Sequence, residues 1–262
     1  MSGPKIAALY GLIPNRLGFC GPRQEILKKF LAGKLGIVDV IPVLEKFEAA
    51  YSYYELIAQK NKVRTGPLNK RVVEAYWIGN ELLEKVTADD LRQLIIKKFT
   101  KPGLLSKEEA EIKAKSIPEN SKPHHSFHVL ILGSITGRID FTGDSKLKDT
   151  CRIEWGRVIK IPNTKKPYSS RWLDEPIRQK AKIIVQCNPL VGEKVIKLGK
   201  AVKKEVIWEK EILPLLNIGD WVSLHWNHAI QILKEKDIIN LHKYTQNTLD
   251  GLYEKKQKTC FE

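Results

Sequence analysis

The apolar residues of this chain change their spacing near residue 120, and this change restricts the fold more than any other feature of the sequence. Before it, apolar residues recur every three or four positions, most clearly in residues 41–61 and 68–86, as they do on amphipathic helices. From Cys151 onward, short β-branched runs alternate with turn residues, which is typical of a small β-barrel or sandwich. The sequence therefore predicts an α+β protein, with a helical domain at residues 1–120 and a small β domain at residues 121–262 that ends in a helix.

Local signals refine these boundaries. Residues 22–36 begin with proline and end with glycine, as helices often do. Thr87 and Ser106 each precede an acidic residue three positions later, which is the pattern of a capped helix start. Residues 116–125 contain two prolines and no apolar periodicity, so we expect either a linker there or the first turn of the next domain. The β-branched apolar run at residues 127–135 then predicts a strand.

The sequence gives no sign of export, membrane insertion or a cysteine framework. No apolar run approaches the roughly 20 residues that a spanning helix needs, and the first residues do not read as a signal peptide, so we expect a cytoplasmic protein. The four cysteines are few and scattered, and no CxxC pair occurs. Motifs of hydrolases, nucleotide-binding proteins and zinc proteases are also missing, so we do not expect an enzyme.

Two short motifs of the β domain resemble the HypC/HupF family of hydrogenase-maturation chaperones. Residues 151–158 read Cys-Arg-Ile-Glu-Trp-Gly-Arg-Val, and the family opens with Met-Cys-Leu-Ala-Ile-Pro-Gly-Arg-Val. Residues 219–225 read Gly-Asp-Trp-Val-Ser-Leu-His, which is similar to the family's second signature before its final helix. The two motifs occur in the family's order, and the resemblance covers residues 150–255.

This resemblance implies an OB-like barrel and a function in assembling a [NiFe] centre. The partners would be the hydrogenase large subunit or a HypD-like protein, and the cargo an Fe(CN)2CO unit carried transiently. By motif match, Cys151 would bind iron or a partner and His225 would support it. Two departures qualify the match, because Cys151 is internal rather than N-terminal and Trp155 replaces a proline. The whole chain also resembles a family of uncharacterised bacterial and archaeal proteins, whose genes we expect near those of [NiFe] hydrogenases.

An OB-like nucleic-acid-binding module is the alternative interpretation. The net charge of +15 favours phosphate binding, but the excess divides about evenly between residues 1–122 and the remainder instead of forming one basic stripe. We expect four tryptophans in the core and rim of the barrel, and exposed on its face they would stack on bases. They are Trp155, Trp208, Trp221 and Trp226.

Five histidines and one further cysteine are the other candidates. On a strand, His124 and His128 would share one face and His125 would take the opposite one. Together with His225 and His228 they would form a nickel, zinc or iron site, or else a set of hydrogen-bonding histidines at a domain interface. Cys20 lies between two glycines before a helix start, where a lowered thiol pKa would make it reactive; the alternative is a thiol that packs in a tight turn.

Overall fold

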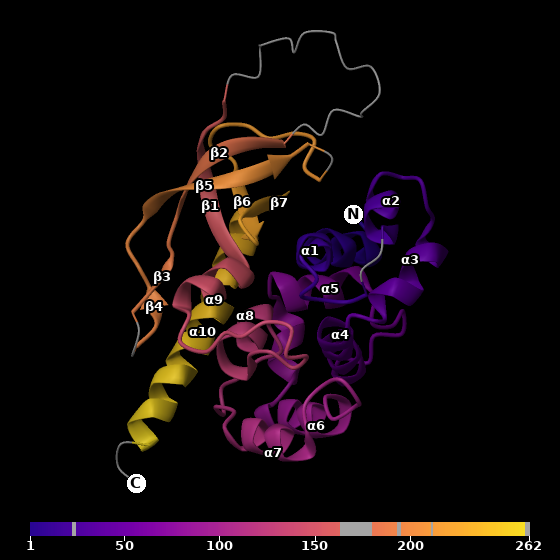
Figure 1. The fold of residues 1–262 in the computed structure, drawn as a ribbon, viewed down its shortest axis with the longest axis vertical. Coiled ribbons are helices and arrows are strands. Elements are labelled where there is room, and N and C mark those ends of the chain that lie inside the picture. Colours follow the sequence, from indigo (N-terminus) through magenta and orange to yellow (C-terminus); the bar gives the residue numbers. More distant parts are fainter. Residues whose placement is uncertain (23–24, 163–179, 193–194, 211, 260–262) are drawn as a thin grey trace.

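The computed structural model describes residues 1–22, 25–162, 180–192, 195–210 and 212–259, and shows a mixed α+β fold (Figure 1). Cys260 lies outside the described residues. The helices before residue 120 are α1 (Gly3–Arg16), α2 (Ile26–Leu31), α3 (Ile37–Leu44), α4 (Glu48–Lys60), α5 (Lys70–Trp77), the 3-10 helix η1 (Glu81–Lys85), α6 (Ala88–Lys98) and α7 (Lys107–Lys115). Figure 1 shows these helices gathered on one side of the strands.

The predicted helix starts at Thr87 and Ser106 are confirmed. Thr87 accepts a hydrogen bond from the Asp90 amide, and the Asp90 carboxylate accepts one from the Thr87 amide at 3.0 Å. Ser106 and Glu109 form the same reciprocal pair at the start of α7. In contrast, the run at residues 41–61 divides into α3 and α4.

Helix α1 has no counterpart among the predictions, because it is buried on nearly all sides. Twelve of its 14 residues are buried, so its apolar residues do not form one stripe. It packs against α2, α3 and α5, and it also contacts strand β7 (His228–Ile232). Helix α1 therefore connects the helices before residue 120 to the strands, because it contacts both.

The strand predicted at residues 127–135 is wrong. The chain there forms the short helix α8 (His125–Phe127), followed directly by the π-helical turn η2 (His128–Leu132). His124 precedes α8, and its ring accepts a hydrogen bond from the Ser126 amide at 3.2 Å, which caps the helix. A further helix, α9 (Ser145–Cys151), replaces the expected start of the first strand at Cys151.

Five strands pair in a continuous ring, in the order β1-β2-β5-β7-β6, and β6 pairs back with β1. Only the β5–β7 pairing among them is parallel. The strands are β1 (Glu154–Lys160), β2 (Lys180–Cys187), β5 (Val202–Glu209), β6 (Trp221–His225) and β7, and the separate pair β3 (Leu190–Val191) and β4 (Lys197–Leu198) lies beside them. Helix α10 (Glu235–Thr259) follows β7 and runs past the ring (Figure 1).

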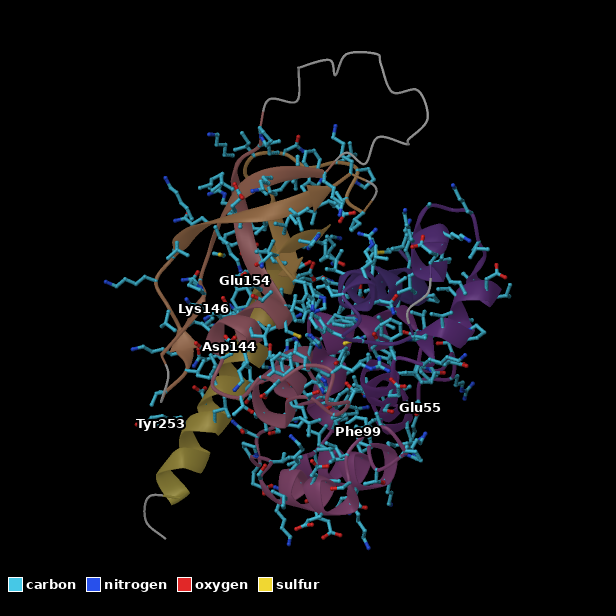
Figure 2. The ribbon with its side chains drawn as sticks, viewed as in Figure 1. Glu55, Phe99, Asp144, Lys146, Glu154 and Tyr253 are labelled. Atoms are coloured by element: carbon cyan, nitrogen blue, oxygen red, sulfur yellow. The ribbon has the colours of Figure 1, made fainter. Side chains whose placement is uncertain are left out.

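Two apolar cores hold these elements together. The smaller one fills the ring with residues such as Val185, Val206 and Leu224. The larger one crosses residue 120, because it joins helical residues such as Phe99, labelled in Figure 2, to Trp155 on β1 and Tyr244 on α10. In the described part of the chain, no helix is both long enough and apolar enough to cross a bilayer.

Candidate metal centre

The pairing of β1 with β6 brings the two motifs of the sequence together. Their antiparallel register places Glu154 opposite Leu224, so the residues just before β1 lie beside the residues at the end of β6. The amide of Trp226 extends this pairing and donates to the carbonyl of Thr150 at 2.8 Å. Cys151, at the end of α9, therefore lies beside His225, at the end of β6.

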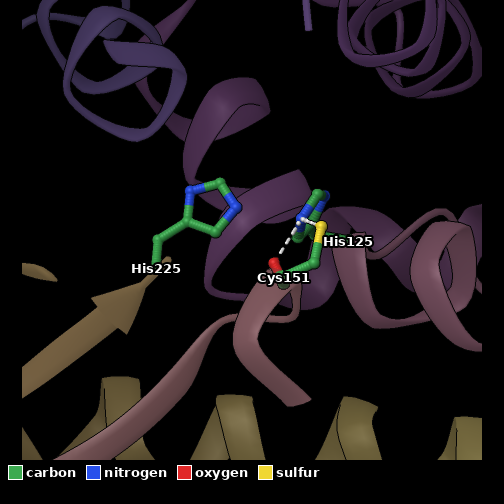
Figure 3. A group of neighbouring side chains, drawn as sticks. All are labelled: His125, Cys151 and His225. Atoms are coloured by element: carbon green, nitrogen blue, oxygen red, sulfur yellow. Dashed lines mark hydrogen bonds between the residues drawn. The ribbon is translucent and has the colours of Figure 1, made fainter. Parts of the chain in front are cut away.

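His125 is the third member of the group (Figure 3). One potential ligand atom from each of His125, Cys151 and His225 lies within 4.8 Å of the others, and all three residues are buried. The Cys151 sulfur is 4.0 Å from Nε2 of His125. Three elements distant in the sequence thus supply two imidazoles and one thiol to one point.

His225 is oriented by the helical part of the chain. Its Nδ1 lies 2.9 Å from the main-chain carbonyl of Tyr10, which can only accept a hydrogen bond, so Nδ1 carries the proton. Nε2 is then the bare nitrogen, and it is buried without a hydrogen-bond partner among the described residues. This tautomer is the one in which Nε2 can bind a metal ion.

Both imidazoles of the group are neutral at neutral pH. Burial lowers the pKa of His225 from 6.5 to about 3, against the opposing effect of its hydrogen bond to Tyr10. Burial, with the nearby His225 and His128 rings, holds the pKa of His125 well below its usual value. Neutral imidazole is the form that binds metals.

The Cys151 thiol is protonated in the metal-free protein, because burial raises its pKa well above the ordinary value. A metal ion would have to displace this proton, since the thiolate is the ligand. The neighbouring backbone is fixed by Arg152, which is fully buried and donates to Asp149 at 2.9 Å and to the carbonyl of Asn188 at 2.9 Å. These contacts hold the end of α9 in place.

The sulfur adjoins a cavity of about 60 Å³, which is room for a few small molecules the size of water. Cys151, His125 and His225 line it, and the rest of the wall is mainly apolar. The apolar wall residues include Phe19, Phe47, Ile135, Phe141 and Trp226. The three side chains are thus buried beside a space that side chains do not fill and that is partly open to solvent.

A tight turn between β6 and β7 shapes one wall of this cavity. Trp226 and Asn227 have φ values of 53° and 57°, the positive angles that a two-residue hairpin turn of type I′ requires at both central positions. A tryptophan rarely adopts such a backbone, and here its indole packs on Phe19 with 4.7 Å between ring centroids. The unusual backbone conformation of Trp226 therefore places its indole in the wall of the cavity, where it packs on Phe19.

Comparison with known proteins gives one result. A family model described as a family of unknown function (DUF6390) matches residues 1–259. The chain belongs to this family. No curated protein and no solved structure matches it. The matched range includes His125, Cys151 and His225, so the whole centre lies within the DUF6390 region.

The other histidines predicted as ligands do not join the group in this DUF6390 chain. His124 caps α8, and its ring stacks on Tyr244. His128 lines the same cavity, but its Nδ1 faces the Tyr53 hydroxyl at 3.4 Å. His228 lies on β7, where its Nδ1 donates to the Trp226 carbonyl at 2.7 Å and its Nε2 is 3.4 Å from Glu209.

His125 belongs to the donor group, whereas His124 and His128 were expected there. The expectation assumed a strand, but the segment is helical. On a strand, residues two or four apart share a face, whereas on a helix residues three or four apart do. The rings of His125 and His128 accordingly stack, with 6.2 Å between their centroids. A helical reading of residues 124–132 would have placed His125 on the same face as His128, but the β-branched composition of the segment argued against a helix.

Burial contradicts the reactive thiol expected at Cys20 and agrees with the expected place of the four tryptophans in the core and at its edge. Burial raises the pKa of Cys20 to about 12, which is opposite to the lowered pKa expected for a reactive thiol; Cys20 lines the cavity instead. Trp155, Trp208 and Trp226 are buried and Trp221 is half-buried, so an exposed row of tryptophans for base stacking is not present among these residues.

Proposed function

We propose that this chain is an accessory protein of [NiFe]-hydrogenase maturation in the cytoplasm. In this role it binds the large-subunit precursor or a HypD-type partner and holds an iron unit, such as Fe(CN)2CO, through Cys151 and His225. The observation that carries the proposal is the meeting of these two side chains at one buried point, each contributed by one of the two HypC-like motifs. Iron is the cargo in this proposal and not a resident cofactor.

The chemistry of the donors fits such a cargo. A thiolate is a soft, strongly donating ligand, and imidazole is suited to iron, nickel and zinc. His225 presents a buried nitrogen that lacks a hydrogen-bond partner among the described residues, and burying such an atom costs free energy unless a ligand meets it. A bound metal ion would satisfy that nitrogen and give the buried sulfur its charge partner.

The arrangement of the strands also supports the proposal. The two motif-bearing strands β1 and β6 are neighbours, and the five strands return on themselves as in the OB-like barrel that the HypC resemblance implies. Helix α10 follows, in the position of the family's final helix. Our proposal is that the ring presents the cargo and that the helical part closes over it.

Copurification tests this function. The tagged full chain, produced anaerobically in a host that assembles a [NiFe] hydrogenase, is expected to retain the large-subunit precursor or a HypD-type protein together with iron. Cys151→Ser should lose the iron and weaken the complex. Cys187→Ser is the matched control, because Cys187 is also a buried thiol but lies inside the ring, in the other core.

The opposing result is equally clear. If the wild-type chain retains neither iron nor a hydrogenase-maturation protein, or if Cys151→Ser retains both at the level of Cys187→Ser, the proposal is wrong. Salt-sensitive binding of oligonucleotides that is unchanged in Cys151→Ser would instead support the nucleic-acid alternative.

A further inference from the structure

His125 is held by hydrogen bonds at both ring nitrogens. Its Nε2 is 3.0 Å from the carbonyl oxygen of Cys151, which can only accept, so Nε2 carries the proton. Its Nδ1 is then the acceptor, and the Tyr76 hydroxyl donates to it across 3.0 Å. Tyr76 is itself fully buried between the rings of Tyr53 and Trp77.

The two histidines of the centre are therefore in opposite states. His225 has its proton on Nδ1 and offers a bare Nε2, whereas His125 has its proton on Nε2, the atom that faces Cys151. For His125 to bind a metal ion through Nε2, its proton must move to Nδ1. The Tyr76 hydroxyl permits this move, because a hydroxyl that donates in one state can rotate and accept in the other.

We propose that His125 is the third protein ligand of the centre and that Tyr76 is the positioning residue that holds its ligating tautomer. This inference rests on the proposed function and names a third ligand for the same site. Bonds form from Nε2 of His125, Nε2 of His225 and the Cys151 sulfur to a divalent ion such as Fe²⁺. The thiol proton leaves to solvent buffer, and His125 keeps one proton, now on Nδ1 and donated to Tyr76.

The donor set limits the class of metal. Two imidazoles and one thiolate suit Fe²⁺, Co²⁺ and Zn²⁺, and three protein ligands leave one position of a four-coordinate ion without a protein donor. The trigonal His2Cys copper sites add a weak axial ligand, commonly a methionine, but the one methionine of this chain is Met1, which is 59% exposed. The cavity of about 60 Å³ gives room for small additional ligands on the ion.

Cobalt is a suitable probe, because Co²⁺ replaces Fe²⁺ or Zn²⁺ and absorbs visible light. Anaerobic titration of the full chain with Co²⁺ should produce a thiolate-to-cobalt charge-transfer band and the d–d bands of a low-coordinate ion. Tyr76→Phe keeps the buried ring but removes the hydroxyl. Its Co²⁺ affinity should fall by about 10- to 100-fold, while the charge-transfer band returns at saturation because Cys151 still binds.

Tyr53→Phe is the matched control. Tyr53 is a buried tyrosine stacked on Tyr76, and its hydroxyl faces His128, which is outside the donor group. Its Co²⁺ affinity should equal that of the wild type. His125→Gln removes the third ligand outright, so its d–d bands should change in position and intensity, and its affinity should fall further than that of Tyr76→Phe.

The outcomes separate this inference from the proposed function. If the wild type shows no thiolate-to-cobalt band, both the third ligand and the Cys151–His225 metal site are overturned. If the wild type binds Co²⁺ but His125→Gln has the same spectrum and affinity, only the inference about His125 fails. If His125→Gln is weakened but Tyr76→Phe matches Tyr53→Phe, His125 stands as a ligand and the assignment of Tyr76 is wrong. Should Tyr76→Phe not fold, His125→Gln decides the ligand set.

Discussion

The main-chain carbonyl of Tyr10 accepts a hydrogen bond from Nδ1 of His225 at 2.9 Å, and so joins α1 to β6 across 215 residues of sequence. The side chain of Tyr10 adds a second link, because its hydroxyl donates to the Ser223 hydroxyl at 2.8 Å. The carbonyl fixes the tautomer of His225, whereas the hydroxyl only ties the two elements together. The centre therefore requires both the helical part and the ring, even though its motifs lie in the ring.

Tyr10→Phe separates these two links. The substitution removes the hydroxyl and leaves Ser223, which is fully buried, without this partner, but it leaves the carbonyl bond to His225 in place. We expect the free energy of unfolding to fall by about 1–2 kcal/mol and the Co²⁺ affinity to stay at the wild-type value. Chemical denaturation and cobalt titration of the same preparation measure the two quantities. A loss of affinity comparable to that of Tyr76→Phe would show that the side chain of Tyr10 is needed for the centre.

Glu209 at the end of β5 makes stability depend on acid pH. Burial opposes its ionisation, but hydrogen bonds from His228, Lys180 and Arg16 outweigh that effect and lower its pKa below 4.5. A carboxylate whose pKa is depressed in the folded state stabilises that state above its unfolded pKa, and the stabilisation is lost as pH falls through the folded value. This contribution is therefore present above about pH 4.5 and declines below it.

Glu209→Gln should remove that contribution. We expect a loss of about 2 kcal/mol at pH 7, less than for a fully buried pair, because the side chains of Arg16 and Lys180 are 31% and 42% exposed. The difference between variant and wild type should shrink as the pH is lowered below 4.5. Urea denaturation across that range tests this, and a difference that stays constant with pH would contradict the role of the carboxylate charge.

The sequence alone singled out Cys151 and His225 as candidates, but it did not single out His125. Cys151 and His225 could be named as candidates because each belongs to a short motif, and the pairing of β1 with β6 brings the two motifs together. His125 was placed on the wrong face, because the β-branched run after it resembles a strand while the chain there is helical. The choice between strand and helix was decided by packing against Tyr76 and α10, which is tertiary information.

Helix α1 shows the same limit in the fold. Sequence periodicity detects a helix by the contrast between a buried and an exposed face, and α1 has almost no exposed face. The helices with a capped start and one solvent-facing side, such as α6 and α7, were predicted near their observed positions. The carbonyl that orients His225 belongs to α1, so the least predictable helix supplies one of the contacts on which the centre depends.

The buried histidines make the metal-free protein sensitive to mild acid. Burial lowers the pKa of His124 to about 3, of His128 to about 4 and of His225 to about 3, and holds that of His125 well below 6.5. The unfolded chain therefore binds more protons than the folded one between pH 6.5 and these values, so stability falls as pH falls. Each neutral histidine contributes a slope of up to about 1.4 kcal/mol per pH unit.

Chemical denaturation of the metal-free chain at several pH values between about 7.5 and 5 measures this slope. Proteins are usually most stable between about pH 5 and 8, so the chain should stay folded over this range. His128→Gln should lower the slope of stability against pH by up to about 1.4 kcal/mol per pH unit, because one titrating group is removed. The variant should therefore lose less stability than the wild type on acidification, whatever its stability at pH 7. An unchanged slope would mean that His128 takes up its proton over the same pH range in the folded and in the unfolded chain.

Gly79 connects α5 to α10 by close approach, and its replacement should be among the most damaging in the chain. Its φ is +95°, and a Cβ there would lie 2.2 Å from Cδ2 of Tyr244, which is held by a 2.8 Å hydrogen bond to the carbonyl of Asn80. Gly79→Ala must therefore strain the backbone and also displace the tyrosine ring. We expect a loss of roughly 3 kcal/mol or more in the free energy of unfolding.

Gly66→Ala isolates the backbone part of this effect. Gly66 also has a positive φ, +81°, but nothing lies within 4 Å of its added Cβ. This variant should lose only about 1–2 kcal/mol, the cost of a left-handed conformation for alanine. If denaturation gives equal losses for the two variants, the contact between Gly79 and Tyr244 does not hold α10 in place, and the packing of α10 on the helical part must depend on other residues.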